Sequence, residues 1–297
     1  MRASLIVEFL IIYFNKKTSI AMKKHLLLWA TVFALGLVFT ACNKADNEAP
    51  ADAVMTSEDL TTSMDVFQST EDEIETELES RGPNGPNTCP TVTFSPADGS
   101  FPRTVTIDYG TDGCEGPDGR IRRGQIVVTQ SDSMRNAGAV RTATLVDFYV
   151  DDAHVEGTKT WTNQGFDNNG NPVLTRTVTG GSITFPDGSQ TTWEANHTIT
   201  LIEGAATPAL FDDVVQITGG SNGVNRNGVA YSFVIDDEDP LIKRRLCRWV
   251  ESGTLEMTVG NITRLINYGN GTCDPYAMLT LENGNTRPIH VRAWWRP

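Results

Sequence analysis

Hydrophobic and polar residues alternate along much of the chain after Cys89, and this alternation predicts β-strands. The clearest run is Trp193–Leu201, in which the odd-numbered residues form an apolar face that includes His197 and the even-numbered residues are polar. Side chains of a strand point alternately to its two faces, so a period of two kept over this whole run indicates one packed and one solvated face. Similar runs occur at residues 146–150, 155–161 and 249–259.

Turn signals separate these alternating runs. Asp-Gly or Asn-Gly pairs begin at Asp98, Asn169, Asp187 and Asn283. Glycine and asparagine accept the positive φ that tight hairpin turns need. The sequence therefore predicts an all-β body over residues 89–297, built as an antiparallel β-meander of about a dozen strands. A sandwich and a curved open sheet both satisfy this pattern.

The segment before this body has a different composition. Residues 43–88 contain twelve acidic residues against Lys44 and Arg81, and few large apolar side chains. Such a composition is typical of a solvated linker, because the chain cannot bury enough apolar surface to offset the entropy of ordering it. We therefore expect an acidic tether over residues 42–88.

A short helix is nonetheless expected within this tether. Apolar residues recur at spacings of three, four and seven positions, at Leu60, Met64, Phe67, Ile74 and Leu78. Thr56 and Asp59 can cap the start of a helix, and Gly82-Pro83 can end it. The pattern predicts a helix over residues 57–80, whose apolar stripe either docks on the β-rich body or binds another protein.

The first 41 residues have the features of an export signal. Met22-Lys23-Lys24 precedes an apolar run from Leu26 to Phe39. A run of about fourteen apolar residues is short for a membrane span and typical of a signal peptide. The run ends in Phe39-Thr40-Ala41-Cys42, which resembles the lipobox read by lipoprotein signal peptidase, so Cys42 is the expected site of lipidation, including palmitate. The alternative is a transmembrane helix that ends in a cysteine by chance.

Two further features bear on the export and location of the protein. The signal is complete from Met22 onward, so we expect the true start at Met22 rather than Met1. Asp46 and Glu48, just after the lipobox, resemble the signal that carries Bacteroidota lipoproteins to the outer face of the outer membrane. An ordinary solvated linker would have the same composition.

Charge excludes one class of partner. Residues 1–41 carry five cations and one anion, so the part from Cys42 onward has a net charge of −17, against −13 for the whole chain. An exported body this acidic repels nucleic acid and anionic membrane surfaces. We therefore expect the membrane to be reached through the lipid anchor alone, and no nucleic-acid partner.

Cysteine number indicates a covalent framework. The chain has five cysteines, and without Cys42 an even set remains: Cys89, Cys114, Cys247 and Cys273. An even set in an exported chain favours two disulfides. A structural zinc site is the alternative, but the sequence has no CxxC pair, and the histidines at positions 154, 197 and 290 are scattered. No metal or other cofactor is therefore expected.

An internal repeat selects the disulfide pairing. Residues 107–115 and 266–274 share Ile-x-Tyr-Gly, a cysteine after three further residues, and then an acid. Another cysteine precedes each motif cysteine, with 24 residues between the two in the first copy and 25 in the second. Two copies of one motif should close the same local loop, which predicts Cys89–Cys114, Cys247–Cys273 and two related lobes.

The lipobox, the acidic tether and the paired Tyr-Gly-x-x-x-Cys motif together resemble a family of Bacteroidota surface-exported outer-membrane lipoproteins. The resemblance covers most of the chain. It implies a location at the outer membrane and a β-rich fold, and it does not identify an activity or a catalytic residue.

Acidic clusters are the first candidates for a metal or hydrolytic site. Asp236, Asp237 and Asp239 lie beside Pro240 in an expected loop, where several carboxylates could bind calcium weakly. A solvated acidic turn is the simpler interpretation. Acids at 151–152 and 212–213 are adjacent, and adjacent side chains of a strand point to opposite faces. Asp167 begins a segment that superficially resembles a calcium loop, but Pro172 stands where glycine is needed, so a hairpin turn is expected.

Recognised catalytic motifs are missing from the sequence. It contains no Gly-x-Ser-x-Gly elbow, no P-loop and no dinucleotide fingerprint. Pairing of the four cysteines would leave no free thiol. His197 lies on the apolar face of a predicted strand, which favours a core histidine over a catalytic one.

Tryptophans are the remaining candidate for ligand binding. Trp161, Trp193, Trp249, Trp294 and Trp295 could form a platform for sugar rings. Trp294 is the best candidate because alternation turns it to the opposite side from Trp295. Core packing explains most of these residues equally well.

The sequence thus predicts a non-catalytic lipoprotein, anchored at the outer membrane and displayed on the cell surface, that serves as a structural or interaction module for other envelope proteins. The alternative is a glycan-binding accessory of a nutrient-uptake system, which requires exposed coplanar tryptophans. A calcium-dependent or hydrolytic enzyme is a third hypothesis, and it requires three or more carboxylates in one pocket.

Overall fold

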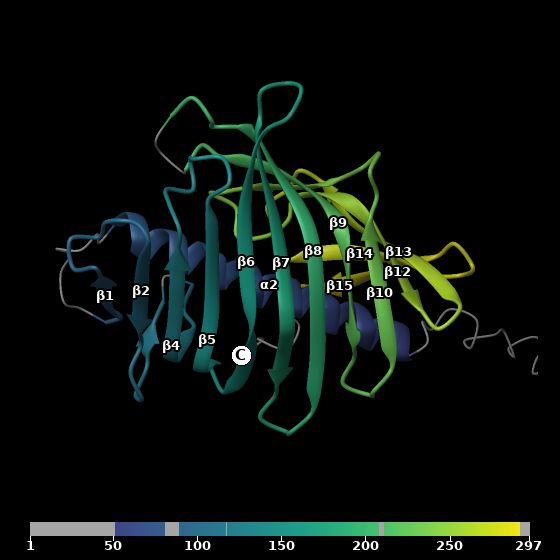
Figure 1. Cartoon of the computed structure of the whole chain (residues 1–297). Helices are drawn as coiled ribbons and strands as arrows, with labels where there is room; N and C mark the ends of the chain where they lie inside the picture. Colours follow the sequence, from purple (N-terminus) through teal and green to yellow (C-terminus); the bar gives the residue numbers. More distant parts are fainter. Residues whose placement is uncertain (1–50, 81–88, 117, 208–210, 292–297) are drawn as a thin grey trace, which may run out of the picture. The chain divides into compact units, whose positions relative to one another are not determined.

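A single antiparallel sheet and one long helix make up the part of the chain that the computed structural model describes, residues 51–80, 89–116, 118–207 and 211–291 (Figure 1). The elements are α2 (Ala51–Ser80), β1 (Thr91–Ser95), β2 (Arg103–Asp108), β3 (Cys114–Glu115), β4 (Ile121–Gln130), β5 (Val140–Val150), β6 (Ala153–Phe166), β7 (Pro172–Thr184), β8 (Gln190–Glu203), β9 (Val214–Val224), β10 (Ala230–Ile235), β11 (Leu241–Arg244), β12 (Ser252–Val259), β13 (Ile262–Asn270), β14 (Tyr276–Thr280) and β15 (Thr286–His290).

The strands form an antiparallel meander, as the alternation predicts. Sheet order is β1-β2-β4-β5-β6-β7-β8-β9-β10-β12-β13-β14-β15, with β3 paired to β4 and β11 paired to both β9 and β12. Consecutive strands are therefore neighbours almost throughout. Of the two arrangements left open, the described strands form one curved sheet and not a sandwich of two.

Four hairpin connections lie where the sequence predicts them. Gly99, Gly170, Gly188 and Gly284 all have positive φ, between 74° and 83°. Each lies in the connection between two paired strands, respectively β1–β2, β6–β7, β7–β8 and β14–β15. Asp167 accepts backbone hydrogen bonds from Asn169 and Asn171, both at 2.8 Å, and so stabilises the β6–β7 turn.

The sheet curves around α2. Phe67 of α2 packs against Trp193 of β8, with ring centroids 5.0 Å apart. Met64, less than one turn earlier, has its Sδ atom 3.7 Å from the hydroxyl of Tyr268 on β13. One helix can touch strands this far apart in the sheet order only if the sheet bends, and Figure 1 shows α2 running along one side of the long strands.

The helix is part of the core, and in this respect the expected tether is wrong over residues 51–80. It begins at Ala51, six residues earlier than the predicted start, and of the side chains described, those of residues 53–78, only Thr76 is exposed. The prediction failed because many acids in one segment usually mean solvation. Here the acids face cations that the strands bring to them.

Hydroxyl side chains explain how a polar helix tolerates burial. Ser57, Thr61 and Thr70 donate to backbone carbonyls four residues earlier, at 2.5, 2.9 and 2.8 Å. A buried hydroxyl that donates its hydrogen bond within its own helix needs no partner on the sheet. Between these hydroxyls, Leu60 and Phe67 supply apolar contacts to the two halves of the core.

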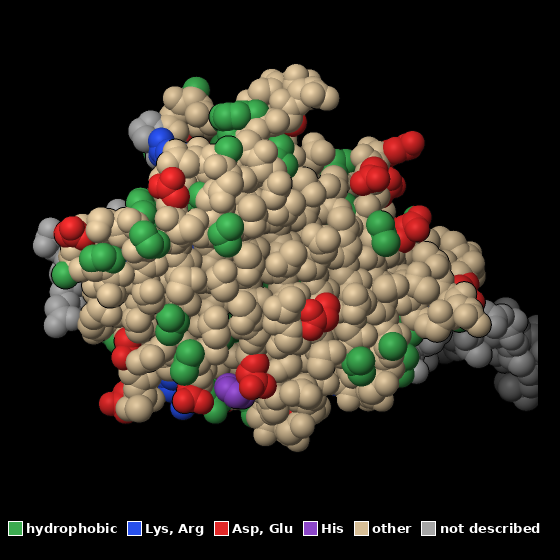
Figure 2. Space-filling model, in the orientation of Figure 1, with side chains coloured by type: hydrophobic (Ala, Val, Ile, Leu, Met, Phe, Trp, Pro, Cys, Tyr) green, Lys and Arg blue, Asp and Glu red, His purple; other side chains and the backbone are tan. Residues whose placement is uncertain are grey.

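The outer face of the sheet carries the polar positions of the alternating pattern. In Figure 2, this face consists mainly of backbone and of side chains that are neither charged nor hydrophobic, with charged and hydrophobic side chains scattered among them. On β8, Trp193, Ala195, His197 and Ile199 are buried as expected. The apolar face of the alternating pattern thus packs on α2, and the polar face meets solvent.

Candidate functional site

A cluster of buried charges holds the middle of α2 against the sheet. Glu71 accepts hydrogen bonds from Lys159 of β6 at 2.6 Å, Arg176 of β7 at 3.0 Å and Trp161 at 2.9 Å. Lys159 also donates to the backbone oxygen of Phe67 at 3.0 Å. These contacts give the buried carboxylate two cationic partners and a neutral donor, which is the condition for keeping a charge in a core.

The cluster shifts the pKa values of its members. Burial raises the pKa of Glu71, but the charges of Lys159 and Arg176 outweigh burial and hold this pKa well below its ordinary value. Burial lowers the pKa of Lys159 to about 8, against the opposing effect of Glu71. At neutral pH the carboxylate and the ammonium therefore remain an ion pair.

His197 extends this network without forming a catalytic triad. Its Nδ1 lies 3.0 Å from Arg176 Nη2, and its Nε2 lies 3.3 Å from the hydroxyl of Ser221. A serine-based triad needs a carboxylate behind the histidine, and here an arginine occupies that position. Burial, together with the charge of Arg176, lowers the pKa of His197 well below its ordinary value. The prediction of a core histidine is confirmed.

A second cluster joins loops from distant parts of the sheet. Asp118, before β4, accepts from Arg122 at 2.8 and 3.0 Å and from Arg248 at 3.0 Å. Arg120 forms a short ion pair with Asp65 of α2. Because Arg248 precedes β12, the Asp118–Arg248 pair links the loop before β4 to the loop before β12 across the helix.

An arginine row crosses the inner face of the sheet. We use this name for six residues that are successive cross-strand partners from β2 to β8: Arg103, Gln130, Arg141, Trp161, Arg176 and His197. Directly opposite residues of antiparallel strands share one face, so all six point toward α2. The row lies beside Gln68, Glu71 and Glu75 of the helix.

A cavity of about 520 Å³ opens beside the arginine row. Its floor is the C-terminal half of α2, including Asp72, Glu75 and Leu78. Its walls are the inner faces of β6–β9 together with β11 and the loops before β2, β5 and β9. This cavity combines apolar walls with several cations.

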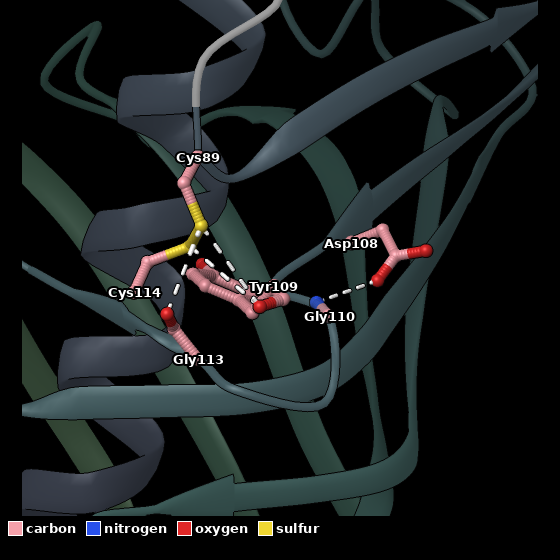
Figure 3. Close-up of a disulfide and its surroundings, with 6 residues drawn as sticks. All are labelled: Cys89, Asp108, Tyr109, Gly110, Gly113 and Cys114. Carbon is pink, nitrogen blue, oxygen red and sulfur yellow. Dashed lines mark hydrogen bonds between the residues drawn. A yellow bond between two sulfur atoms is a disulfide. The ribbon is translucent and has the colours of Figure 1, made fainter.

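Both predicted disulfides are present. Cys89 pairs with Cys114 and Cys247 pairs with Cys273, with Cα–Cα distances of 5.8 and 5.7 Å. Figure 3 shows the first bridge beside the turn that carries Tyr109. The sulfur atoms of Cys247 and Cys273 are bonded to each other, so their closeness to Glu251 does not create a metal site.

The two copies of the repeat share one backbone design. Gly110 and Gly269 both have positive φ, 68° and 94°, and each donates its amide at 2.8 Å to the side chain two residues earlier, Asp108 or Asn267 (Figure 3 for the first copy). In each copy, the tyrosine just before this glycine, Tyr109 or Tyr268, is buried in the core. The first copy begins at the end of β2 and reaches β3, and the second begins on β13, so the copies lie near opposite ends of one continuous sheet.

The candidate acidic site remains a surface loop. Asp237 and Asp239 are exposed; Asp239 accepts from Thr254 at 2.7 Å, and Asp236 accepts the backbone amide of Glu238 at 2.9 Å. These carboxylates are not among the acid, cysteine or histidine groups that converge as metal ligands in the described residues. Local hydrogen bonds account for two of them.

The tryptophans divide into two groups. Trp161 and Trp193 are buried and Trp249 is partly buried, so these three do not form an exposed platform. Trp294 and Trp295 lie outside the described residues, as do the signal segment, Met22 and Cys42. The predictions for these residues stay predictions.

Sequence reasoning missed the charged interior. Arg141, Lys159 and Arg176 occupy inward positions of strands whose other inward residues are mostly apolar, and α2 carries ten acids and no cation. The sequence contained a signal for this charged interior. One predicted helix has an excess of acids, and cations stand at inward strand positions. This combination indicates complementary partners, whereas the acidic segment alone indicates a linker.

Membrane-spanning helices and similarity to known proteins were both considered for this chain. In the described residues, no helix has the length and apolar character needed to span a membrane. Comparison with protein-family models, curated proteins and solved structures finds no match to this chain.

Proposed function

We propose that the protein is a non-catalytic lipoprotein of the cell envelope, anchored through Cys42 at the outer membrane and acting there as a structural or interaction module. The observation that carries this proposal is the lipobox at Phe39–Cys42, directly after the signal-like apolar run. Both disulfides downstream support an oxidising compartment, because such bonds persist mainly outside the cytoplasm.

The buried polar groups support a non-catalytic role. Glu71, Lys159 and Arg176 neutralise one another, and His197 has partners on both ring nitrogens. Groups that are fully engaged in holding a helix to a sheet are not poised to exchange protons with a substrate. The glycan-binding alternative gains no support from the described tryptophans, since none of them forms an exposed platform.

Metabolic labelling tests the anchor. Cells that express the full chain with Cys42→Ala should incorporate no labelled palmitate into it, whereas Asn43→Ala, at the neighbouring position, should be labelled like the native protein. The Cys42→Ala chain should persist as a precursor or be released in soluble form. Stable membrane association of the uncleaved native chain, without label, would instead indicate a transmembrane signal anchor.

Protease added to intact cells tests on which side of the outer membrane the β-rich body lies. Surface display predicts that the β-rich body is digested while a periplasmic marker protein is spared. Full protection of the body until the outer membrane is permeabilised would place it on the periplasmic side. A labelled and anchored protein that is protected would retain the lipoprotein proposal and overturn only surface display.

A further inference from the structure

We propose that the cavity beside the arginine row binds a single-chain amphiphile with a carboxylate head group, such as a long-chain fatty acid. The volume of about 520 Å³ falls within the range of about 300–1,000 Å³ that is usual for small-molecule sites. This inference does not depend on the lipid anchor, because it rests only on the side chains that line the cavity.

One wall of the cavity is suited to an alkyl chain. Leu174, Ile199 and Ile217 are successive cross-strand partners on β7, β8 and β9, and so form a continuous apolar strip. Leu201 and Val215 are partners one step closer to the loops and extend this strip. All five line the cavity. An extended apolar strip that faces an open cavity gains stability by covering its surface with another apolar group.

The mouth of the cavity also carries apolar side chains. Phe101 and Phe166 line it while keeping exposed fractions of 40% and 71%. Large apolar side chains that are exposed at the rim of a cavity are typical of ligand entrances.

The cavity is basic beside Phe101, whose ring centroid lies 4.5 Å from the guanidinium carbon of Arg103. Arg103 donates to two neutral oxygens, the backbone oxygen of Gly99 at 3.5 Å and Oε1 of Gln130 at 3.2 Å, and its buried Nε has no partner among the described residues. Burial and the charge of Arg141 both lower the pKa of Arg103. Arg141 has Glu75 at 3.8 Å, whereas the oxygens that accept from Arg103 are neutral. Arg103 therefore favours an anion beside it, and the guanidinium fork matches a planar carboxylate.

The charges of the lining favour a monoanion. The lining contains six cations (Arg103, Arg135, Arg141, Arg176, Lys243, Arg245) and four acids (Glu71, Asp72, Glu75, Asp213), a net charge of +2 in a strongly acidic protein. Four of these cations lie within 4 Å of acids on α2: Arg141, Arg176, Lys243 and Arg245. Because these acids face the same cavity, a phosphate dianion would meet more repulsion than a carboxylate does.

Displacement of a dansyl-labelled fatty acid tests the proposal. The full chain is used with Cys42→Ala, which removes the covalent lipid that would otherwise compete for the cavity. Competitors share one alkyl chain and differ in the head group: dodecanoate, dodecanol and dodecyl phosphate. We expect dodecanoate to displace the probe most strongly, and butyrate, which lacks the long chain, not to displace it.

Variants locate the head group. Arg103→Gln should weaken dodecanoate binding at least about tenfold and leave dodecanol unchanged, since it removes a charge-assisted hydrogen bond. Arg287→Gln, on the exposed surface of β15 outside the cavity, is the matched control and should bind like the parent. If Arg103→Gln fails to fold by circular dichroism, the exposed loop variant Arg135→Gln takes its place, with a smaller loss expected.

Three results would overturn the proposal. The folded chain could fail to bind the probe or dodecanoate. Dodecanol could compete as well as dodecanoate, which would remove the role of the cations. Dodecyl phosphate could bind more tightly than dodecanoate, which would overturn the carboxylate assignment. None of these results bears on palmitate labelling of Cys42, so the failure of one proposal is distinguishable from the failure of the other.

Discussion

The two halves of α2 are buried in different ways. In the N-terminal half, Ser57 and Thr61 satisfy themselves within the helix, and Leu60 packs in an apolar cluster with strands β8–β15. In the C-terminal half, Glu71 and Asp72 form ion pairs with cations of the sheet, Lys159 and Lys243. The first half has one buried ion pair, Asp59 with Arg226 at 2.6 Å, whereas the second adds several charge pairs to the apolar contacts of Phe67 and Ile74.

The difference has a consequence for binding. A close-packed interface leaves no room for a ligand, because each apolar atom already has neighbours. The cavity opens along the C-terminal half of α2, where Glu71, Asp72 and Glu75 line it together with cations of the sheet. The N-terminal half therefore serves stability, and the C-terminal half provides both stability and a cavity.

Removing the charge of Glu71 should have the largest effect. Glu71→Gln preserves shape but leaves Lys159 and Arg176 without their carboxylate, and breaking a buried ion pair costs about 3–5 kcal/mol. Urea unfolding followed by tryptophan fluorescence measures this loss. Glu203→Gln is the control, because Glu203 is 61% exposed and lies 3.7 Å from an exposed Arg244, and we expect a change below about 1 kcal/mol. Equal losses in the two variants would contradict the charge-paired description.

Leu60→Ala tests the close-packed half. Leu60 is fully buried, so truncation removes apolar contacts and leaves a cavity, with an expected loss of about 3 kcal/mol in the free energy of unfolding. The same urea experiment measures it. Val234→Ala is the matched control, since Val234 is 60% exposed on β10. A loss for Leu60→Ala no larger than for this control would show that the N-terminal half of α2 is not close-packed.

Acid should separate the two halves of the helix. The pKa of Glu71 in the folded state lies below its ordinary value of 4.5, so its stabilisation is present above about pH 4.5 and is lost as the pH falls below that value. The difference between the native protein and Glu71→Gln should shrink there by about 1.4 kcal/mol per pH unit. The difference for Leu60→Ala should stay constant. Unfolding curves at several pH values between 7 and about 3 measure both, and a pH-independent Glu71→Gln difference would refute the coupling.

The smallest effect is expected at the solvent side of α2. Thr76 is exposed, and its hydroxyl donates to the backbone oxygen of Asp72 at 2.7 Å. Alanine has the higher helix propensity, so Thr76→Ala should raise the free energy of unfolding by up to about 0.5 kcal/mol. A large loss of stability in this variant would contradict the exposed position of the Thr76 side chain.

The strands and turns were predictable because their determinants are local. The alternation over Trp193–Leu201 assigns each side chain to a face, and glycines such as Gly170 and Gly188 provide the positive φ that their turns need. The disulfides were predictable for a related reason. Each copy of the repeat carries its own pair of cysteines and closes a loop of similar length.

The burial of α2 was not predictable from its own residues. Its apolar stripe at Leu60, Phe67 and Ile74 indicated a helix, but ten acids in thirty residues indicated solvent. Neutralisation of those acids depends on Arg120, Lys159 and Arg176, which lie more than fifty residues away along the chain. No local pattern pairs a given acid with a given cation.

The sequence by itself determined the β-rich class, the hairpin positions and the disulfide pairing, because each of these depends on the conformation or spacing of residues in one short stretch. Tertiary structure alone decided that the sheet curves around α2, that the arginine row faces the helix acids, and that a cavity remains beside that row. These features arise only when strands from β2 to β13 meet one helix, since charge neutralisation and the space left between side chains depend on all of them at once.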